Sequence, residues 1–218
     1  KPPFPVEVGV FGKPTLVNNV ETLVNVLSIV KDGGAAYAAL GTEGSKGRKL
    51  FCLSGAVAKP GIYEVEFGIT LRQLIELGGG MRGGSTMQAI LLGGAAGGFV
   101  GPNDLDLPLT MEATRAAGSS LGSGVVMVLD QSVDMVDQLR RIAAFFRDES
   151  CGQCVPCRVG TVRQEEIVSR LAKGVQSQDI ELLRELGTVM RDASICGLGQ
   201  TANSAIDSAI NKLKVFAV

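Results

Sequence analysis

The chain contains no histidine and no tryptophan, and only 2 tyrosines and 8 phenylalanines among its 218 residues. Without histidine it lacks the commonest general base and the commonest imidazole ligand, so nucleophilic catalysis by a Ser/His or Cys/His pair is excluded. Any metal chemistry in this protein must therefore use thiolates or carboxylates.

An excess of one charge and long hydrophobic runs are also missing. The 21 Lys and Arg against 22 Asp and Glu give a net charge of -1, and the chain has no run of basic residues that could bind along a phosphate backbone. Nucleic acid is therefore not an expected partner. No segment reaches the roughly 18–20 consecutive apolar residues of a membrane span, and the N-terminus lacks the apolar core of a signal peptide. We therefore expect a soluble, cytoplasmic protein.

The pattern along the chain predicts three parts. Residues 1–45 begin as an extended arm rich in Pro and Gly, followed by a helix that Asn18 or Asn19 caps and then by a flexible connection. Val20, Leu23, Val24 and Leu27 recur at helical spacing and predict its apolar face.

Residues 46–130 change to the two-residue period of strands. Residues 49–55 and 62–67 predict a hairpin, Thr70 and Gln73 predict a capping box at the start of a short helix, and residues 88–94 and 125–130 predict two more strands. A loop rich in Gly, Pro and Asp separates these last two strands. Two strands, a helix and two strands predict a small mixed sheet with a helix on one face, the β-grasp or ubiquitin-like arrangement.

Residues 131–218 show no strand pattern. Apolar residues at helical spacing predict four amphipathic helices, and their short connections predict an antiparallel four-helix bundle. The predicted fold class is therefore α+β.

Three of the five cysteines form the motif Cys151-x-x-Cys154-x-x-Cys157. Thiolates this close can hold three corners of a [4Fe–4S] cube, and Cys196, in the segment SICGLG, is the remote thiolate that closes it. Four thiolates also suit zinc, usually as two separated CxxC pairs, and a merely structural or redox-active cysteine set is a third alternative. The odd count argues against a disulfide framework.

Two further residues have simpler interpretations. Cys52 lies within the apolar run LFCLSG and is expected to be a buried small hydrophobic residue. Arg158 follows the cysteine motif, where its charge would raise the reduction potential of an anionic cluster; the alternative is a surface ion pair with Asp148 or Glu149.

Four segments resemble one known family. KPPFPVEVGVFGKPTLVNNVETL, SGAVAKPGIYEV, ESCGQCVPCRVGT and SICGLGQTA are similar, in order, to the flavin-containing NADH-binding subunits of respiratory complex I, NAD-reducing hydrogenases and NAD-dependent formate dehydrogenases. The cysteine segments look most like the beta (diaphorase) subunit of formate dehydrogenase, since complex I relatives typically carry Glu where this chain has Val159.

The resemblance implies a cofactor role for particular residues. It implies a [4Fe–4S] cluster on Cys151, Cys154, Cys157 and Cys196, and FMN next to Asn18, Asn19 and Thr22 and to the turn Gly197, Leu198 and Gly199. Asn18 and Asn19 open a helix, where free backbone amides suit a phosphate, although the residues alone indicate only helix caps.

The resemblance covers only the C-terminal half of the family. The glycine-rich flavin and nucleotide segments that family members carry upstream are absent, so residues 1–45 would be the end of a flavin-binding domain, 46–130 a β-grasp (SLBB) domain, and 131–218 an iron–sulfur helical domain. FMN and NAD would bind mainly in the missing part, and we expect this chain alone to be inactive with NADH. A separately encoded flavin-binding polypeptide is a further possibility.

The function that the resemblance implies is an electron relay between FMN, which exchanges hydride with NAD, and other iron–sulfur centres. The implied partners are a thioredoxin-like [2Fe–2S] subunit or domain and a larger catalytic iron–sulfur subunit. The implied enzyme is a formate dehydrogenase, with complex I or an NAD-reducing hydrogenase as the alternative. An alternative of another class is a non-catalytic, zinc-stabilised interaction module.

Overall fold

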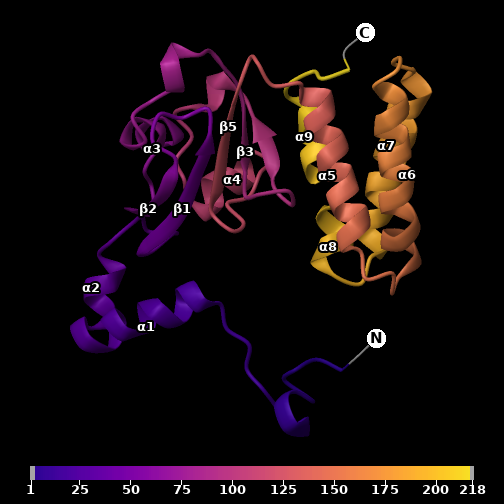
Figure 1. The fold of residues 1–218 in the computed structure, drawn as a ribbon. Helices are drawn as coiled ribbons and strands as arrows, with labels where there is room; N and C mark the ends of the chain where they lie inside the picture. The colour runs from indigo at the N-terminus through magenta and orange to yellow at the C-terminus, as the bar shows by residue number, and fades with distance from the viewer. Residues whose placement is uncertain (1–2, 217–218) are drawn as a thin grey trace.

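The computed structural model describes residues 3–216, so the first two residues of the predicted arm and the last two of the predicted helical domain lie outside the described residues. Three parts follow one another along the chain: an N-terminal arm with α1, a sheet unit, and a helical bundle (Figure 1). The sheet lies beside the bundle, and the arm and α1 (Val20–Asp32) lie beneath them. No helix of the described part is long and apolar enough to cross a membrane.

The sheet is mixed, as predicted, and has five strands in the order β2-β1-β5-β3-β4. Strands β1 and β5, far apart in sequence, pair in parallel at its centre, and the other neighbours pair antiparallel. The strands are β1 (Arg48–Gly55), β2 (Gly61–Glu66), β3 (Met87–Leu92), β4 (Gly98–Val100) and β5 (Val125–Asp130).

The sequence predicted four strands and missed β4, which lies in the stretch expected to be a loop. Its three residues, Gly-Phe-Val, are too few to show a two-residue period, and it becomes a strand by pairing with the edge of β3. The same stretch contains a short helix, α4 (Met111–Ala116).

Helix α3 (Leu71–Leu77) covers one face of the sheet. The predicted capping box is present: the Gln73 N–H donates to Thr70 Oγ1 at 3.2 Å, and the Thr70 N–H donates to Gln73 Oε1 at 2.9 Å. Leu71, Leu74 and Ile75 of α3 are buried against alternate strand residues that point to this face. These strand residues include Phe51, Leu53, Ile90, Leu92, Val100, Val126 and Val128.

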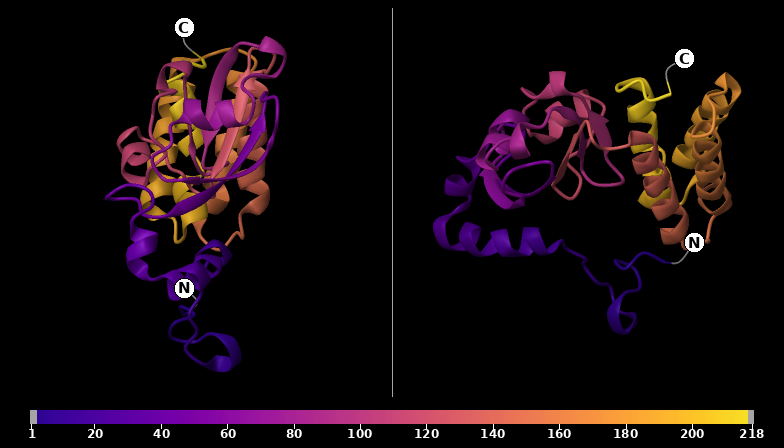
Figure 2. Two further views of the ribbon diagram at one scale, coloured as in Figure 1. Left: turned by 90° about the vertical axis from the view of Figure 1, so that its left-hand side faces the viewer. Right: turned by 45° about the horizontal axis from the view of Figure 1, so that its top comes forward.

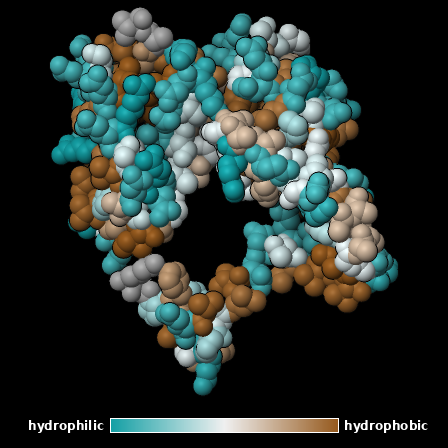
Figure 3. Space-filling view, turned by 180° about the vertical axis from the view of Figure 1, so that it is seen from behind, coloured by the Kyte–Doolittle hydropathy of each residue, from teal (hydrophilic) through white to brown (hydrophobic). Residues whose placement is uncertain are grey.

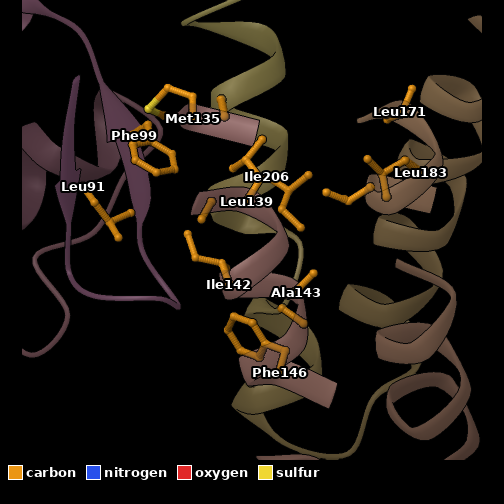
Figure 4. Close-up of a cluster of buried hydrophobic side chains, with 14 of the residues drawn as sticks. Leu91, Phe99, Met135, Leu139, Ile142, Ala143, Phe146, Leu171, Leu183 and Ile206 are labelled. Atoms are coloured by element: carbon orange, nitrogen blue, oxygen red, sulfur yellow. The ribbon is translucent and has the colours of Figure 1, made fainter. Parts of the chain in front are cut away.

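The opposite face of the sheet packs against the helical bundle. Leu91 and Phe99 of the sheet contact a core that includes Met135 and Leu139 of α5 and Ile206 of α9 (Figure 4). This second core covers β3, β4 and β5 but contains no residue of β1 or β2. Alternate residues of the strands therefore point into two separate cores, one between the sheet and α3 and one between the sheet and the bundle.

The structure has a helix at each of the four places that the sequence predicted in the bundle, plus a short fifth helix. Each of α5, α6 and α7 packs against the next along the chain. The helices are α5 (Met135–Glu149), α6 (Val155–Leu171), α7 (Ser177–Ala193), α8 (Gly197–Thr201) and α9 (Ser204–Asn211).

Helix α1 (Val20–Asp32) forms as predicted, but it has no buried residue; it is followed by the short α2 (Gly34–Ala38). Its predicted apolar face is exposed, with Val20 73% and Leu27 74% accessible. Figures 2 and 3 show the arm and α1 extending beneath the rest of the molecule, with hydrophobic residues along them. One anchor ties α1 to the sheet: Glu21 accepts from Lys49 Nζ at 2.9 Å and from the Leu50 N–H at 2.8 Å.

Candidate metal centre

Three of the predicted cysteine ligands lie at the start of α6. Cys151 is in the loop after α5, Cys154 is the N-cap residue of α6, and Cys157 is in its first turn. Gly152 has a φ of +73°, a conformation that favours glycine, and its carbonyl accepts from Arg158 Nη1 at 2.9 Å. The loop is therefore folded back on the helix that follows it.

The fourth predicted ligand reaches the same place from another element. Cys196 is the N-cap residue of α8, which packs against α6. The Ile195 N–H, next to Cys196, makes the largest contribution to lowering the pKa of the Cys154 thiol, followed by the N–H of Cys157. The structure therefore brings the end of α7 against the cysteine loop.

Cys157 is the buried member of the group. Burial raises the pKa of the Cys157 thiol, the Ser150 hydroxyl partly offsets this, and the thiols of Cys154, Cys196 and Cys151 raise it further. The Cys157 thiol is thus close enough to each of the other three to be influenced by it electrostatically. Cys151 and Cys196 are exposed, so the group has one side in the bundle core and one side open.

The backbone around this group favours negative charge. Cys154 and Cys196 each precede the first turn of a helix, where unpaired N–H groups and the positive end of the helix dipole lie. Four thiolates together carry a charge of about −4, and a cluster held by them remains anionic. The local backbone therefore suits an anionic cofactor better than an isolated cation.

The four thiols do not form a ready site for one ion. Among residues 3–216, no group of three or more Cys, Asp or Glu side chains is placed to hold a single metal ion. A zinc site with Zn–S bonds of about 2.3 Å needs its sulfurs within about 4 Å of each other, whereas each iron of a cube takes its own thiolate. The described residues therefore contain no preformed site for a single ion.

Two features next to the cysteines fit a bound sulfur cofactor. The Ser194 hydroxyl oxygen is buried and has no hydrogen-bond partner in the described part of the chain. A Cβ on Gly199 would come within 2.3 Å of Ser194 Oγ and 2.9 Å of Cys157 Cβ. A missing side chain thus keeps space beside the thiols, and an orphaned donor faces them.

The residues that the resemblance placed near FMN fall in two separate elements. Asn19 caps α1, its Oδ1 accepting from the Glu21 N–H at 2.8 Å, while Asn18 and Thr22 are exposed. In α8, Leu198 packs against the bundle core and Gly199 against Cys157, whereas a Cβ on Gly197 would meet no heavy atom within 4 Å. The flavin contacts stay predictions.

The structure corrects the interpretation of Cys52, which is exposed rather than buried. Its neighbours Phe51 and Leu53 point to the α3 core, so Cys52 faces the other side of β1, beyond the part of the sheet that the bundle covers. Because the residues of the run LFCLSG are nearly all apolar, the sequence did not show that alternate residues of β1 are exposed.

Arg158 makes no ion pair among the described residues, because its guanidinium binds the Gly152 carbonyl while Arg147 pairs with Asp148 at 2.9 Å. Sequence reasoning missed Ser150 and Ser194. The only signal for them was a serine one or two positions before a motif cysteine.

Comparison with known proteins agrees with this location of the site. Residues 137–215 match the NADH-ubiquinone oxidoreductase-F iron–sulfur binding region, and residues 50–100 match the SLBB domain. The first match includes all four clustered cysteines and implies a [4Fe–4S] cluster in the helical part of the chain.

Several relatives match nearly the whole chain. It is 40% identical over 213 residues to the NADP-reducing hydrogenase subunit HndC of Solidesulfovibrio fructosivorans, covering 97% of this chain and 44% of the relative. It is 39% identical over 215 residues to the F-type subunit of the NADH-quinone oxidoreductase of Mycobacterium bovis, covering 98% and 48%. The crystal structure of an NAD+-reducing [NiFe]-hydrogenase in the H2-reduced state matches with a TM-score of 0.88 at 39% identity, covering 99% of this chain and 37% of that chain. The chain thus spans about half the length of the curated relatives it matches.

Proposed function

The chain is a homologue of these hydrogenase and NADH-quinone oxidoreductase subunits, and from that premise we propose that it is the cluster-bearing, electron-relaying part of an NAD(P)-linked oxidoreductase subunit. The observation that carries the proposal is the meeting of Cys151, Cys154 and Cys157 with Cys196 at the starts of α6 and α8. A [4Fe–4S] cluster held there takes up and releases one electron at a time.

The residues around the thiols have different roles in this proposal. Cys157 and the bundle core behind it exclude water from one side, while the exposed Cys151 and Cys196 leave the other side open to a redox partner. The N–H groups of Ile195 and Cys157 stabilise the charged form of Cys154. The chain itself thus binds, orients and partly shields the cluster.

The flavin belongs on the open side in this proposal. The cysteine loop and α8 lie at the end of the bundle nearest the N-terminal arm (Figure 1). The space-filling view shows an opening between the body of the molecule and this arm (Figure 3). The relatives are about twice as long as this chain, and the exposed apolar face of α1 is a surface that such additional chain would cover. We assign FMN to this side, next to Asn18, Asn19 and Thr22 and to the turn Gly197 to Gly199.

The parent enzyme and its partners are part of the proposal. The relatives named above support a hydrogenase or an NADH-quinone oxidoreductase, and the assignment to a formate dehydrogenase depends on the motif resemblance alone. In each case a thioredoxin-like [2Fe–2S] unit and a larger catalytic iron–sulfur subunit would exchange electrons with this chain.

The test is metal analysis of the anaerobically purified protein. We expect a brown protein with about four iron and four sulfide per chain, and equal loss of iron in Cys154→Ser and Cys196→Ser. Cys52→Ser is the matched control and should keep full iron, because Cys52 lies on β1, outside the bundle. A colourless protein with one zinc per chain, or equal iron loss in Cys52→Ser, would overturn the proposal.

A further inference from the structure

Two serines flank the cysteine group at the ends of the helices that lead into it. Ser150 is the C-cap residue of α5, and Ser194 is the C-cap residue of α7. One therefore precedes Cys151 and the other precedes Cys196. Serine at such a position usually binds the local backbone.

Ser194 is buried without using its hydroxyl. The residue is 6% exposed, and its Oγ has no hydrogen-bond partner among residues 3–216. Its backbone is held on both sides, because its N–H donates to the Met190 carbonyl at 3.2 Å and its carbonyl accepts from Gln200 Nε2 at 3.0 Å. An unpaired buried hydroxyl costs about 1–3 kcal/mol, so its retention requires an explanation.

The space that this hydroxyl occupies is kept open by Gly199. A Cβ there would be 2.3 Å from Ser194 Oγ and 2.9 Å from Cys157 Cβ, so only glycine lets the hydroxyl lie between α8 and the thiols. Ser194 Oγ and Cys157 Cβ border the same position beside Gly199, so the unpaired hydroxyl lies next to the cysteine group.

Ser150 makes the corresponding contact on the other side of the group. Its Oγ lies 3.3 Å from Cys157 Sγ, and its weak contact with the Gly152 N–H is longer, at 3.4 Å. One serine hydroxyl thus contacts the Cys157 thiol, and a second, unpaired one lies next to the same group.

We propose that Ser150 and Ser194 are positioning residues that raise the reduction potential of the cluster, Ser150 by donating an O–H···S hydrogen bond to Cys157 and Ser194 by donating its unpaired O–H to a sulfur of the bound cluster. The inference rests on the proposed function, because it requires the cysteine group to hold a cluster. Reduction adds one electron, and part of the added negative charge lies on the sulfurs. A donor aimed at sulfur therefore stabilises the reduced state more than the oxidised state.

The test is an anaerobic redox titration of the iron-loaded protein, followed by electron paramagnetic resonance. Ser150→Ala and Ser194→Ala should each lower the equilibrium constant for reduction about three- to tenfold, where tenfold corresponds to 59 mV for one electron. The double variant should show a larger shift than either single variant. Exchange into D2O should change the Fe–S vibrational frequencies of the wild type more than those of the double variant.

Ser208→Ala is the matched control. Ser208 is also buried, but its Oγ accepts from the Phe99 N–H at 2.7 Å and donates to the Ala205 carbonyl at 2.8 Å, between α9 and β4. This variant should lose stability without any shift in potential.

Three outcomes separate the inferences. An unchanged potential in both serine variants at full iron content would overturn the tuning role. Iron loss in Ser150→Ala and Ser194→Ala, but not in Ser208→Ala, would overturn it in favour of a structural role. A wild-type protein without iron would instead overturn the proposed function itself.

Discussion

Gly199 is the residue at which the structure makes the sharpest mutational prediction. Gly199→Ala would place a Cβ 2.3 Å from Ser194 Oγ, 2.6 Å from Ser194 Cβ and 2.9 Å from Cys157 Cβ. Rotation of the Ser194 side chain would move Oγ but not Cβ, which the backbone fixes. Part of α7, α8 or the cysteine loop must therefore shift.

The size of the shift follows from these distances. Ordinary contact begins at 3.4 Å, so Cys157 Cβ must move by about 0.5 Å and Ser194 Cβ by about 0.8 Å. Functional groups must be held to within about 0.5 Å, so we expect a clear fall in iron content. Overpacking costs about 1–3 kcal/mol, and alanine in a helix regains up to about 1 kcal/mol, which leaves a loss of about 0–3 kcal/mol in the metal-free protein.

Iron and sulfide content, together with urea unfolding of the metal-free protein, measures both effects. Gly174→Ala is the control, because a Cβ at that glycine would meet no heavy atom within 4 Å. It should keep full iron and remain within about 0.5 kcal/mol of the wild type. Full iron in Gly199→Ala, at wild-type stability, would show that α8 does not press against the thiols as described.

Two further predictions concern the sheet unit. Thr70→Ala removes the capping hydroxyl of α3 and should lower the free energy of unfolding by about 1 kcal/mol, measured by urea titration, whereas an unchanged midpoint would contradict the capping box. Burial raises the pKa of Glu21, but the Leu50 N–H and Lys49 outweigh it and lower the pKa below its ordinary value of 4.5. Glu21 thus contributes stability that is present above pH 4.5 and is lost as the pH falls through its folded pKa. Glu21→Gln should reduce this loss of stability at low pH. If the stability of Glu21→Gln varied with pH as that of the wild type does between about pH 3 and about pH 6, the contacts of Glu21 with the sheet would be contradicted.

The sequence by itself determined the elements whose signals are local. The capping box at Thr70 and Gln73, the hairpin of β1 and β2, and the four longer helices of the bundle depend on residues a few positions apart, which fix short-range hydrogen bonds and apolar periodicity. The motif at Cys151, Cys154 and Cys157 was equally local. Cys196 was predicted as the fourth ligand from its segment SICGLG, and this ligand set stays a prediction.

Only the tertiary structure decided features that depend on what packs against each element. Cys52 and Phe51 are neighbours in one apolar run, yet Cys52 is exposed because the bundle covers the sheet only over β3, β4 and β5. Strand β4 exists because β3 offers it an edge. The Ile195 N–H influences Cys154 only because α7 ends beside α6. Such contacts join residues far apart in the chain, so no local pattern could reveal them.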